Sequence, residues 1–165
     1  MNSEVSEKEA EDLYKKIKSA ADSGGYILNP DNSFTLALIE GLIVNEKRYG
    51  YQACPCRLAS GTKNEDLDII CPCDYRDQDI NEFGACYCAL YVNRAIADGK
   101  QKLQPVPERR NPDKKDSSAE TVSASNLKYP IWRCAVCGYI CARTNPPEIC
   151  PICKVPKERF EIFMK

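Results

Sequence analysis

The sequence predicts two domains of different character: a mainly α-helical domain at residues 1–99 and a small domain at residues 129–165, joined by a flexible linker at residues 100–128. Three observations support this division. Two helical patterns with capping residues precede the first cysteines, the composition changes after residue 99, and the last forty residues carry two C-x2-C pairs. A chain of 165 residues is long enough for two small domains.

The first helix is expected to run from Ser6 to about Asp22. The sequence Ser6-Glu7-Lys8-Glu9 is a capping-box pattern, and Gly24-Gly25 ends the periodic segment. Apolar residues three or four positions apart predict the buried face, and they are Ala10, Leu13, Ile17 and Ala20. We interpret this helix as a packing element.

A second helix is expected after the turn Pro30-Asp31-Asn32-Ser33, which supplies its cap. It carries a broad apolar surface, and Gly41 is expected to weaken it somewhat. Lys47 and Arg48 in its last turn are favourable at the negative end of the helix dipole. The helix leads directly to the first cysteines.

Three Cys-x-Cys pairs follow within thirty-five residues: Cys54-Pro55-Cys56, Cys71-Pro72-Cys73 and Cys86-Tyr87-Cys88. A cubane iron–sulfur cluster uses four cysteine ligands, which would leave two cysteines for a redox-active disulfide. Zinc sites with shared ligands and structural disulfides are the alternatives. The disulfides are disfavoured because cysteines separated by one residue bridge each other poorly and no secretory signal precedes them.

The segment from Arg48 to Leu58, together with the two later pairs, resembles the catalytic subunit of ferredoxin:thioredoxin reductases. The resemblance covers about Glu7 to Val92. It implies that Cys56 and Cys88 are the redox-active pair. It also implies four ligands of a [4Fe-4S] cluster, namely Cys54, Cys71, Cys73 and Cys86.

One departure from the family pattern C-P-C, C-P-C, C-H-C affects the mechanism, because Tyr87 stands where the family has histidine. The spacings between the pairs also differ somewhat from the plant and cyanobacterial form. The chain contains no histidine, and a phenol with a reference pKa of about 10 is a poor base near neutral pH. We therefore expect Tyr87 to pack or to donate a hydrogen bond rather than to act as an acid catalyst.

The resemblance implies ferredoxin as the electron donor and a thioredoxin-like or other disulfide protein as the acceptor. Cys56 would attack the acceptor disulfide and Cys88 would resolve the mixed disulfide. A ferredoxin near about −400 mV and a thioredoxin near about −270 mV differ by about 6 kcal/mol for two electrons, so reduction runs forward. A nicotinamide donor would require a G-x-G-x-x-G fingerprint, which the sequence lacks.

The C-terminal segment carries the paired motifs Cys134-Ala135-Val136-Cys137 and Cys150-Pro151-Ile152-Cys153. Paired C-x2-C motifs form tetrahedral four-thiolate sites for iron or zinc. From about Tyr129 to Phe163 the segment closely resembles the rubredoxin domain of rubrerythrins, which implies a small β-rich fold. The resemblance implies one mononuclear iron bound by Cys134, Cys137, Cys150 and Cys153. A zinc ribbon is the alternative, and Cys141 is left over as a free thiol.

Charge and hydropathy limit the remaining possibilities. The net charge of −1 gives no reason to expect nucleic acid or an anionic membrane as a partner, and no apolar run reaches eighteen residues. The polar N-terminus is unlike a targeting peptide, so a cytoplasmic location is expected. The predicted fold class is a mainly α domain binding a [4Fe-4S] cluster plus a small β-rich rubredoxin-like domain. The predicted function is ferredoxin-dependent reduction of a protein disulfide, and the alternatives are a non-catalytic electron carrier and a zinc-binding interaction module.

Overall fold

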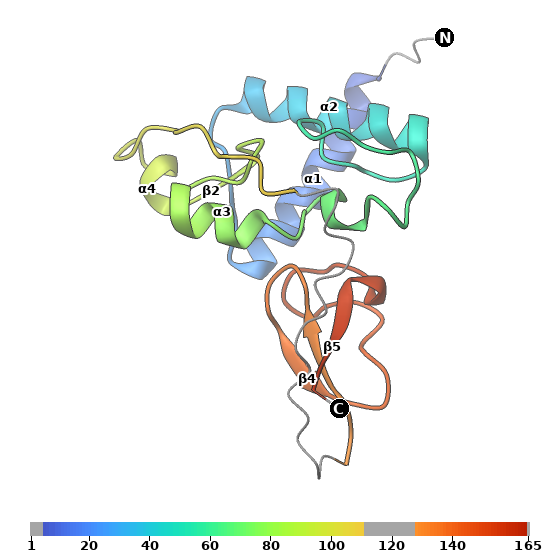
Figure 1. Ribbon diagram of the computed structural model, residues 1–165. Coiled ribbons are helices and arrows are strands. Elements are labelled where there is room, and N and C mark those ends of the chain that lie inside the picture. Colours follow the sequence, from blue (N-terminus) through green and yellow to red (C-terminus); the bar gives the residue numbers. More distant parts are fainter. Residues whose placement is uncertain (1–4, 111–127, 165) are drawn as a thin grey trace. The chain divides into compact units, whose positions relative to one another are not determined.

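The computed structural model describes residues 5–110 and 128–164. The chain divides into two compact units, Met1–Pro107 and Glu108–Lys165, of which the first is helical and the second contains a small sheet (Figure 1). The predicted combination of a mainly α-helical part and a small β-rich part is thereby confirmed. Most of the expected linker, residues 111–127, lies outside the described residues.

The first helix, α1, spans Glu7–Gly24 and begins as the capping box predicts. The backbone N–H of Glu9 donates to the Ser6 hydroxyl at 3.2 Å, and the backbone N–H of Ser6 donates to Glu9 Oε2 at 2.9 Å. The helix ends at Gly25, whose φ of 76° is accessible to glycine without strain. These reciprocal hydrogen bonds explain why the helix begins at this position.

The second helix, α2, spans Asn32–Tyr49, and the Asp31 side chain caps it by accepting from the backbone N–H of Phe34 at 3.0 Å. Its inward residues form the centre of the first unit's core, and they are Thr35, Leu38, Ile39, Leu42 and Ile43. Lys47 forms an ion pair with Glu9 of α1 at 3.1 Å, and Arg48 lies over the ring of Tyr49. The basic last turn is therefore engaged with neighbouring side chains of the same unit.

The remaining elements of the first unit are short. They are β1 (Ile27–Leu28), the 3-10 helix η1 (Leu67–Ile69), α3 (Arg76–Phe83), β2 (Tyr91–Val92) and α4 (Arg94–Ala97). The strands β1 and β2 pair antiparallel, with Leu28 opposite Tyr91. This pairing, which the sequence analysis did not anticipate, fixes the residues after the third cysteine pair against the segment between α1 and α2.

The second unit is a three-stranded antiparallel sheet in the order β4-β3-β5. Its strands are β3 (Ile131–Cys134), β4 (Ile140–Ala142) and β5 (Phe160–Met164), and the 3-10 helix η2 (Lys157–Arg159) precedes β5. Cys134 pairs with Phe160 at the end of β3 where the metal-site motif begins. Tyr139 meets Phe160 edge to face at 6.5 Å between ring centroids.

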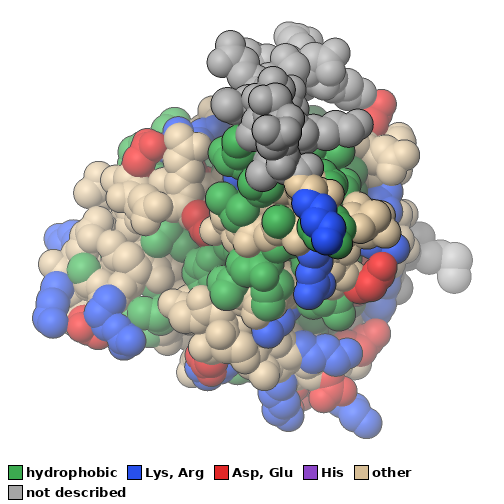
Figure 2. Space-filling view, turned by 90° about the horizontal axis from the view of Figure 1, so that it is seen from below, with side chains coloured by type: hydrophobic (Ala, Val, Ile, Leu, Met, Phe, Trp, Pro, Cys, Tyr) green, Lys and Arg blue, Asp and Glu red, His purple; other side chains and the backbone are tan. Residues whose placement is uncertain are grey.

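No helix among the described residues is long and apolar enough to cross a membrane. Basic and acidic side chains lie interspersed on the face shown in Figure 2, with apolar side chains between them. This mixture agrees with the nearly balanced composition of 23 basic and 24 acidic residues.

Candidate functional site

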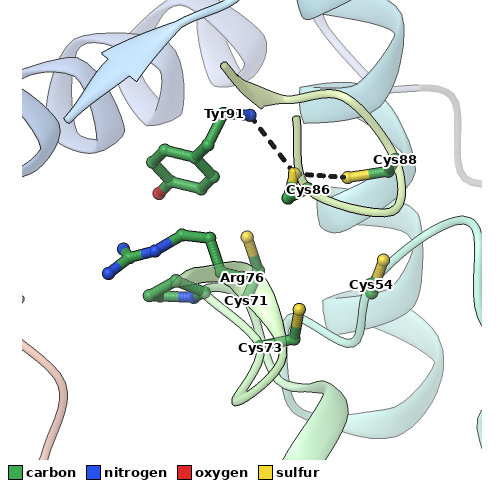
Figure 3. A pocket seen from close by; sticks show the side chains of 8 residues that line it. Cys54, Cys71, Cys73, Arg76, Cys86, Cys88 and Tyr91 are labelled. Carbon is green, nitrogen blue, oxygen red and sulfur yellow. Dashed lines mark hydrogen bonds between the residues drawn. The ribbon is translucent and has the colours of Figure 1, made fainter. Parts of the chain in front are cut away.

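Cysteines from all three Cys-x-Cys pairs surround one pocket in the first unit. The space enclosed, including its open mouth, is about 220 Å³. The lining residues are Cys54, Cys71, Pro72, Cys73, Arg76, Cys86, Cys88 and Tyr91. Figure 3 shows that the sulfur atoms of the five lining cysteines are gathered around the same space. Five of the six predicted cysteines therefore meet here, while Cys56 lies outside the lining and is exposed.

Backbone hydrogen bonds bring the first two pairs together. The N–H of Cys54 donates to the carbonyl of Ile69 at 2.8 Å, and the N–H of Cys71 donates to the carbonyl of Gln52 at 2.9 Å. Ala53 and Ile70 form the antiparallel bridge between these bonds. The residues that precede each Cys-Pro-Cys turn thus form a strand-like segment, and these two segments pair with each other.

The third pair occupies a tight turn. The N–H of Cys86 donates to the carbonyl of Tyr91 at 2.9 Å, and the N–H of Tyr91 donates to the sulfur of Cys86 at 3.3 Å. Ala89 adopts a φ of 56°, which is uncommon for alanine. The Asn29 side chain holds this turn, because its amide donates to the carbonyl of Ala89 at 3.0 Å. Asn29 is a functional-site residue that the sequence analysis missed.

Cys56 and Cys88 differ sharply in environment. Cys56 is exposed, whereas only 8% of Cys88 is accessible. A hydrogen bond with the Cys88 thiol, aided by the charge of Arg57 and opposed by partial burial, lowers the pKa of Cys56 to about 7. Cys56 is therefore a solvent-facing thiol with substantial thiolate character near neutral pH, which is the property a nucleophilic cysteine requires.

The remaining four cysteines fit a positively charged metal group. Cys54, Cys73 and Cys86 are buried and Cys71 is half-buried. Burial, reinforced by the charges of neighbouring cysteines, raises the pKa of Cys73 to about 12 and that of Cys71 well above its usual value. Several buried thiolates are unfavourable by themselves, and cationic metal ions would stabilise them. The donor chemistry of the pocket therefore suits metal binding.

Two arginines beside this pocket are buried. Arg76 is 2% exposed, its Cζ lies 3.5 Å from the ring centroid of Tyr26, and its Nε donates to Asp77 at 2.7 Å. Its Nη2 has no hydrogen-bond partner in the part of the chain that the structure describes. Arg57 is 6% exposed, and its Nη2 lies 3.5 Å from Oδ2 of the buried Asp79 of α3.

Residues 74–79 are rich in charge, and such a segment is expected to face solvent, but two of its charged residues do not. Arg76 and Asp79 are buried because α3 turns one face inward. That face combines charged and apolar residues at helical spacing, namely Arg76, Asp79, Ile80 and Phe83. This helical spacing is present in the sequence. Two of the four positions are charged, however, so the segment lacks the apolar pattern by which a buried helix face is identified.

The second unit contains a separate four-thiolate site. The ligand atoms of Cys134, Cys137, Cys150 and Cys153 all lie within 4.8 Å of one another, the only group this tight among residues 5–110 and 128–164. The sulfurs of Cys134 and Cys153 are 3.6 Å apart, as are those of Cys137 and Cys150. A tetrahedral site with metal–sulfur bonds of about 2.3 Å requires about 3.8 Å between sulfurs, so one ion fits.

The two C-x2-C motifs of this site share one backbone conformation. The N–H of Cys134 donates to the carbonyl of Tyr139, and the N–H of Cys150 donates to that of Val155, both at 2.8 Å. The residue after each motif has a positive φ, 75° at Gly138 and 62° at Lys154. Cys141 on β4 is not part of the site, as expected.

These features define a two-domain, cysteine-based redox protein with two separate thiolate sites. Residues 3–120 match the family described as ferredoxin thioredoxin reductase catalytic beta chain. Because this match covers well over half of the chain, the protein belongs to that family, which is one of oxidoreductases.

The second unit has its own relatives. Residues 132–161 match the rubredoxin-like domain of rubrerythrin. The rubrerythrin of Nitratidesulfovibrio vulgaris strain Hildenborough is 52% identical over 32 residues, which are 19% of this chain and 17% of that protein. The chain thus spans less than a fifth of this relative's length, and the likeness concerns the small domain. The second unit is a rubredoxin-like domain whose four-cysteine site suits iron.

Proposed function

We propose that this protein is a ferredoxin-dependent disulfide reductase whose acceptor is a thioredoxin-like protein. One observation carries the proposal. Cys56 is exposed and its pKa is lowered to about 7 by interaction with Cys88, while Cys88 is buried and lines a pocket of further cysteines. A nucleophile that a protein substrate can reach therefore lies beside a thiol that the substrate cannot reach. Membership of the ferredoxin thioredoxin reductase family supports the same reaction.

The pocket is proposed to hold a [4Fe-4S] cluster on Cys54, Cys71, Cys73 and Cys86. All four line the same pocket, and four is the number of cysteine ligands that such a cluster uses. When bound, such a cluster supplies single electrons next to the disulfide. The second unit is proposed to hold one mononuclear iron on Cys134, Cys137, Cys150 and Cys153.

The difference in exposure between Cys56 and Cys88 assigns each its role in the proposed reaction. The Cys56 thiolate attacks one sulfur of the acceptor disulfide, whose S–S bond breaks as a mixed disulfide forms. Cys88 then attacks the sulfur of Cys56 and releases the acceptor as a dithiol. The acceptor has gained two electrons and two protons, and the protein holds a Cys56–Cys88 disulfide. Two one-electron transfers from ferredoxin and two protons restore the thiols.

Substitution of the two cysteines tests the proposal. Cys56→Ser should reduce thioredoxin turnover at least about a hundredfold, because the nucleophile is absent, while iron content and visible spectrum remain those of wild type. Cys88→Ser should trap the mixed disulfide with the acceptor, detectable by mass. Cys141→Ser, which removes a cysteine outside both sites, is the matched control. Full turnover in Cys56→Ser would overturn the assignment of Cys56 as the nucleophile, and absence of thioredoxin reduction by the wild-type protein would overturn the proposal and favour a non-catalytic electron carrier.

A further inference from the structure

The guanidinium of Arg57 contacts residues from both of the other cysteine segments. Arg57 directly follows Cys56, and its Cζ lies 4.3 Å from the ring centroid of Tyr87 and 4.7 Å from that of Tyr75. Tyr87 stands between the two cysteines of the third pair, and Tyr75 follows the second pair by two residues. One planar cation therefore links the three segments that build the pocket.

This cation is held in place by its surroundings. The side chains of Arg57 and of its ion-pair partner Asp79 have no exposed surface. A buried charge is stable only where a partner of opposite sign is close, so the α3 carboxylate restricts where the guanidinium can lie. A cation over an aromatic ring is worth more when both are removed from water. The stack of Arg57 on Tyr87 is thus a defined contact rather than a chance approach.

The hydroxyl of Tyr87 is engaged differently from those of the neighbouring tyrosines. The hydroxyl of Tyr75 donates to Asp68 at 2.8 Å, and that of Tyr26 donates to Asp77 at 3.0 Å. Within the described residues no hydrogen bond of the Tyr87 hydroxyl is found, and its ring supplies the contact with Arg57. The geometry of Tyr87 therefore favours a role for the ring over a role for the phenol.

Each partner of the stack is bonded directly to one member of the redox pair. Arg57 is the residue after Cys56, and Tyr87 is the residue before Cys88. We propose that the Arg57–Tyr87 stack is a positioning device that holds Cys56 and Cys88 close enough to form their disulfide, and that Tyr87 acts through its ring. This inference rests on the proposed function, because it assumes that Cys56 and Cys88 are the redox pair.

Positioning of Cys56 beside Cys88 by the stack has a measurable consequence for their disulfide. Formation of an intramolecular disulfide depends on the effective concentration of one thiol at the other, which falls when their relative position is loosened. Loss of the stack should therefore make the Cys56–Cys88 disulfide easier to reduce. A residue that only filled space would leave this equilibrium unchanged as long as the pocket remained intact.

The experiment equilibrates the iron-loaded, full-length protein with mixtures of reduced and oxidised dithiothreitol under anaerobic conditions. The disulfide accepts two electrons and two protons from the dithiol, which closes to its cyclic disulfide, and the protein thiols are then counted by alkylation and mass. Tyr87→Leu should shift the equilibrium constant about tenfold toward the reduced protein. Tyr87→Phe, which keeps the ring, should stay within about twofold of wild type.

Two further variants complete the design. Arg57→Lys keeps the charge but loses the planar stack, so it should lie between wild type and Tyr87→Leu, and it replaces that variant if Tyr87→Leu fails to fold. Arg48→Met is the matched control, because it removes an arginine stacked on Tyr49 outside the pocket. Iron content is measured for every variant, so that altered equilibria are compared only between equally loaded proteins.

The outcomes separate the inference from the proposed function. A wild-type protein with no Cys56–Cys88 disulfide at any dithiothreitol ratio would overturn the proposed function together with the inference. A disulfide whose equilibrium is the same in Tyr87→Leu and wild type would overturn the inference alone. An equal shift in Tyr87→Phe and Tyr87→Leu would also overturn it, because the hydroxyl and not the ring would then be responsible.

Discussion

Gly41, in the middle of α2, lies directly against Pro55 of the first cysteine pair. A Cβ at position 41 would come within 2.8 Å of the Cβ of Pro55, closer than real Cβ atoms approach. The glycine that weakens the helix by its intrinsic propensity therefore allows the Cys54–Cys56 turn to pack on it. The helix positions the turn that carries the proposed nucleophile.

Gly41→Ala should destabilise the protein, although alanine is the better helix former by about 1 kcal/mol. The added methyl group must displace Pro55 or the helix, and overpacking of this kind reduces stability by about 1–3 kcal/mol. Urea unfolding of the iron-loaded protein and its iron content measure the effect. Glu40→Ala, at the exposed neighbouring position, is the control and should leave both unchanged. A stabilised Gly41→Ala protein with full iron would contradict the close approach.

Glu9 should stabilise α1 in a pH-dependent way. The backbone N–H of Ser6, followed by the Lys47 side chain, lowers the pKa of Glu9 from 4.5 to about 2. A lowered folded-state pKa means that the stabilisation is complete above the unfolded-state value near 4.5 and is lost as the pH falls toward 2. Thermal unfolding at several pH values should therefore show a lower Tm for Glu9→Gln at pH 6, with the difference shrinking below pH 4.5.

The control for this prediction lies in the same helix. Glu11 forms an exposed pair with Lys15 at 3.5 Å and takes no part in the cap, so Glu11→Gln should change the Tm less. Comparison at equal pH cancels acid effects on the rest of the protein. A difference between Glu9→Gln and wild type that persisted undiminished at pH 3 would disagree with the assigned cause.

Arg76 should raise the reduction potential of the cluster that we propose for the pocket. Its buried guanidinium lines the pocket, and its charge acts to lower the pKa of Cys71 against the larger effect of burial. Arg76→Gln should make the potential more negative by something on the order of tens of millivolts, because a nearby positive charge favours an added electron. A redox titration followed by electron paramagnetic resonance measures this.

Arg76→Lys keeps the charge and should have nearly the wild-type potential, whereas Arg94→Gln removes an exposed charge of α4 and controls for net charge. Equal potentials in Arg76→Gln and wild type at equal iron content would show that this cation does not act on the bound group.

The role of the second site can be tested without truncating the chain. Cys137→Ser should remove most of the iron of the rubredoxin-like unit, because one of four converging sulfurs is lost. Cys141→Ser should keep the iron, since its sulfur is outside that group. Iron analysis and the visible spectrum measure occupancy. Undiminished iron in Cys137→Ser would contradict the four-cysteine assignment, and its turnover with ferredoxin would show whether the second site takes part in reduction.

Local signals in the sequence were sufficient for several elements. The capping box at Ser6 and the cap at Asp31 predicted where α1 and α2 begin, because capping hydrogen bonds join residues three positions apart. The C-x2-C spacing predicted the four-thiolate site for the same reason, since each motif is closed by its own backbone hydrogen bonds. The division of the first six cysteines into four ligands and a redox pair stays a prediction.

Local sequence patterns could not predict interactions between residues that are far apart along the chain. The burial of Asp79 depends on Arg57, twenty-two positions earlier, and the support of Ala89 by Asn29 spans sixty positions. Neither partner has a residue type or spacing that identifies the other. The pairing of β1 with β2 was missed because strands of two residues leave no periodic pattern.

By itself, the sequence determined the helix starts, the cysteine motifs and the mainly helical and β-rich division, since each depends on groups that are neighbours along the chain. Only the tertiary structure decided that Cys56 faces solvent while Cys88 faces the pocket, and that a buried arginine stacks on Tyr87. The physical reason is that burial and ion pairing are properties of segments brought together by folding, and the free energy of a charge depends on everything packed around it.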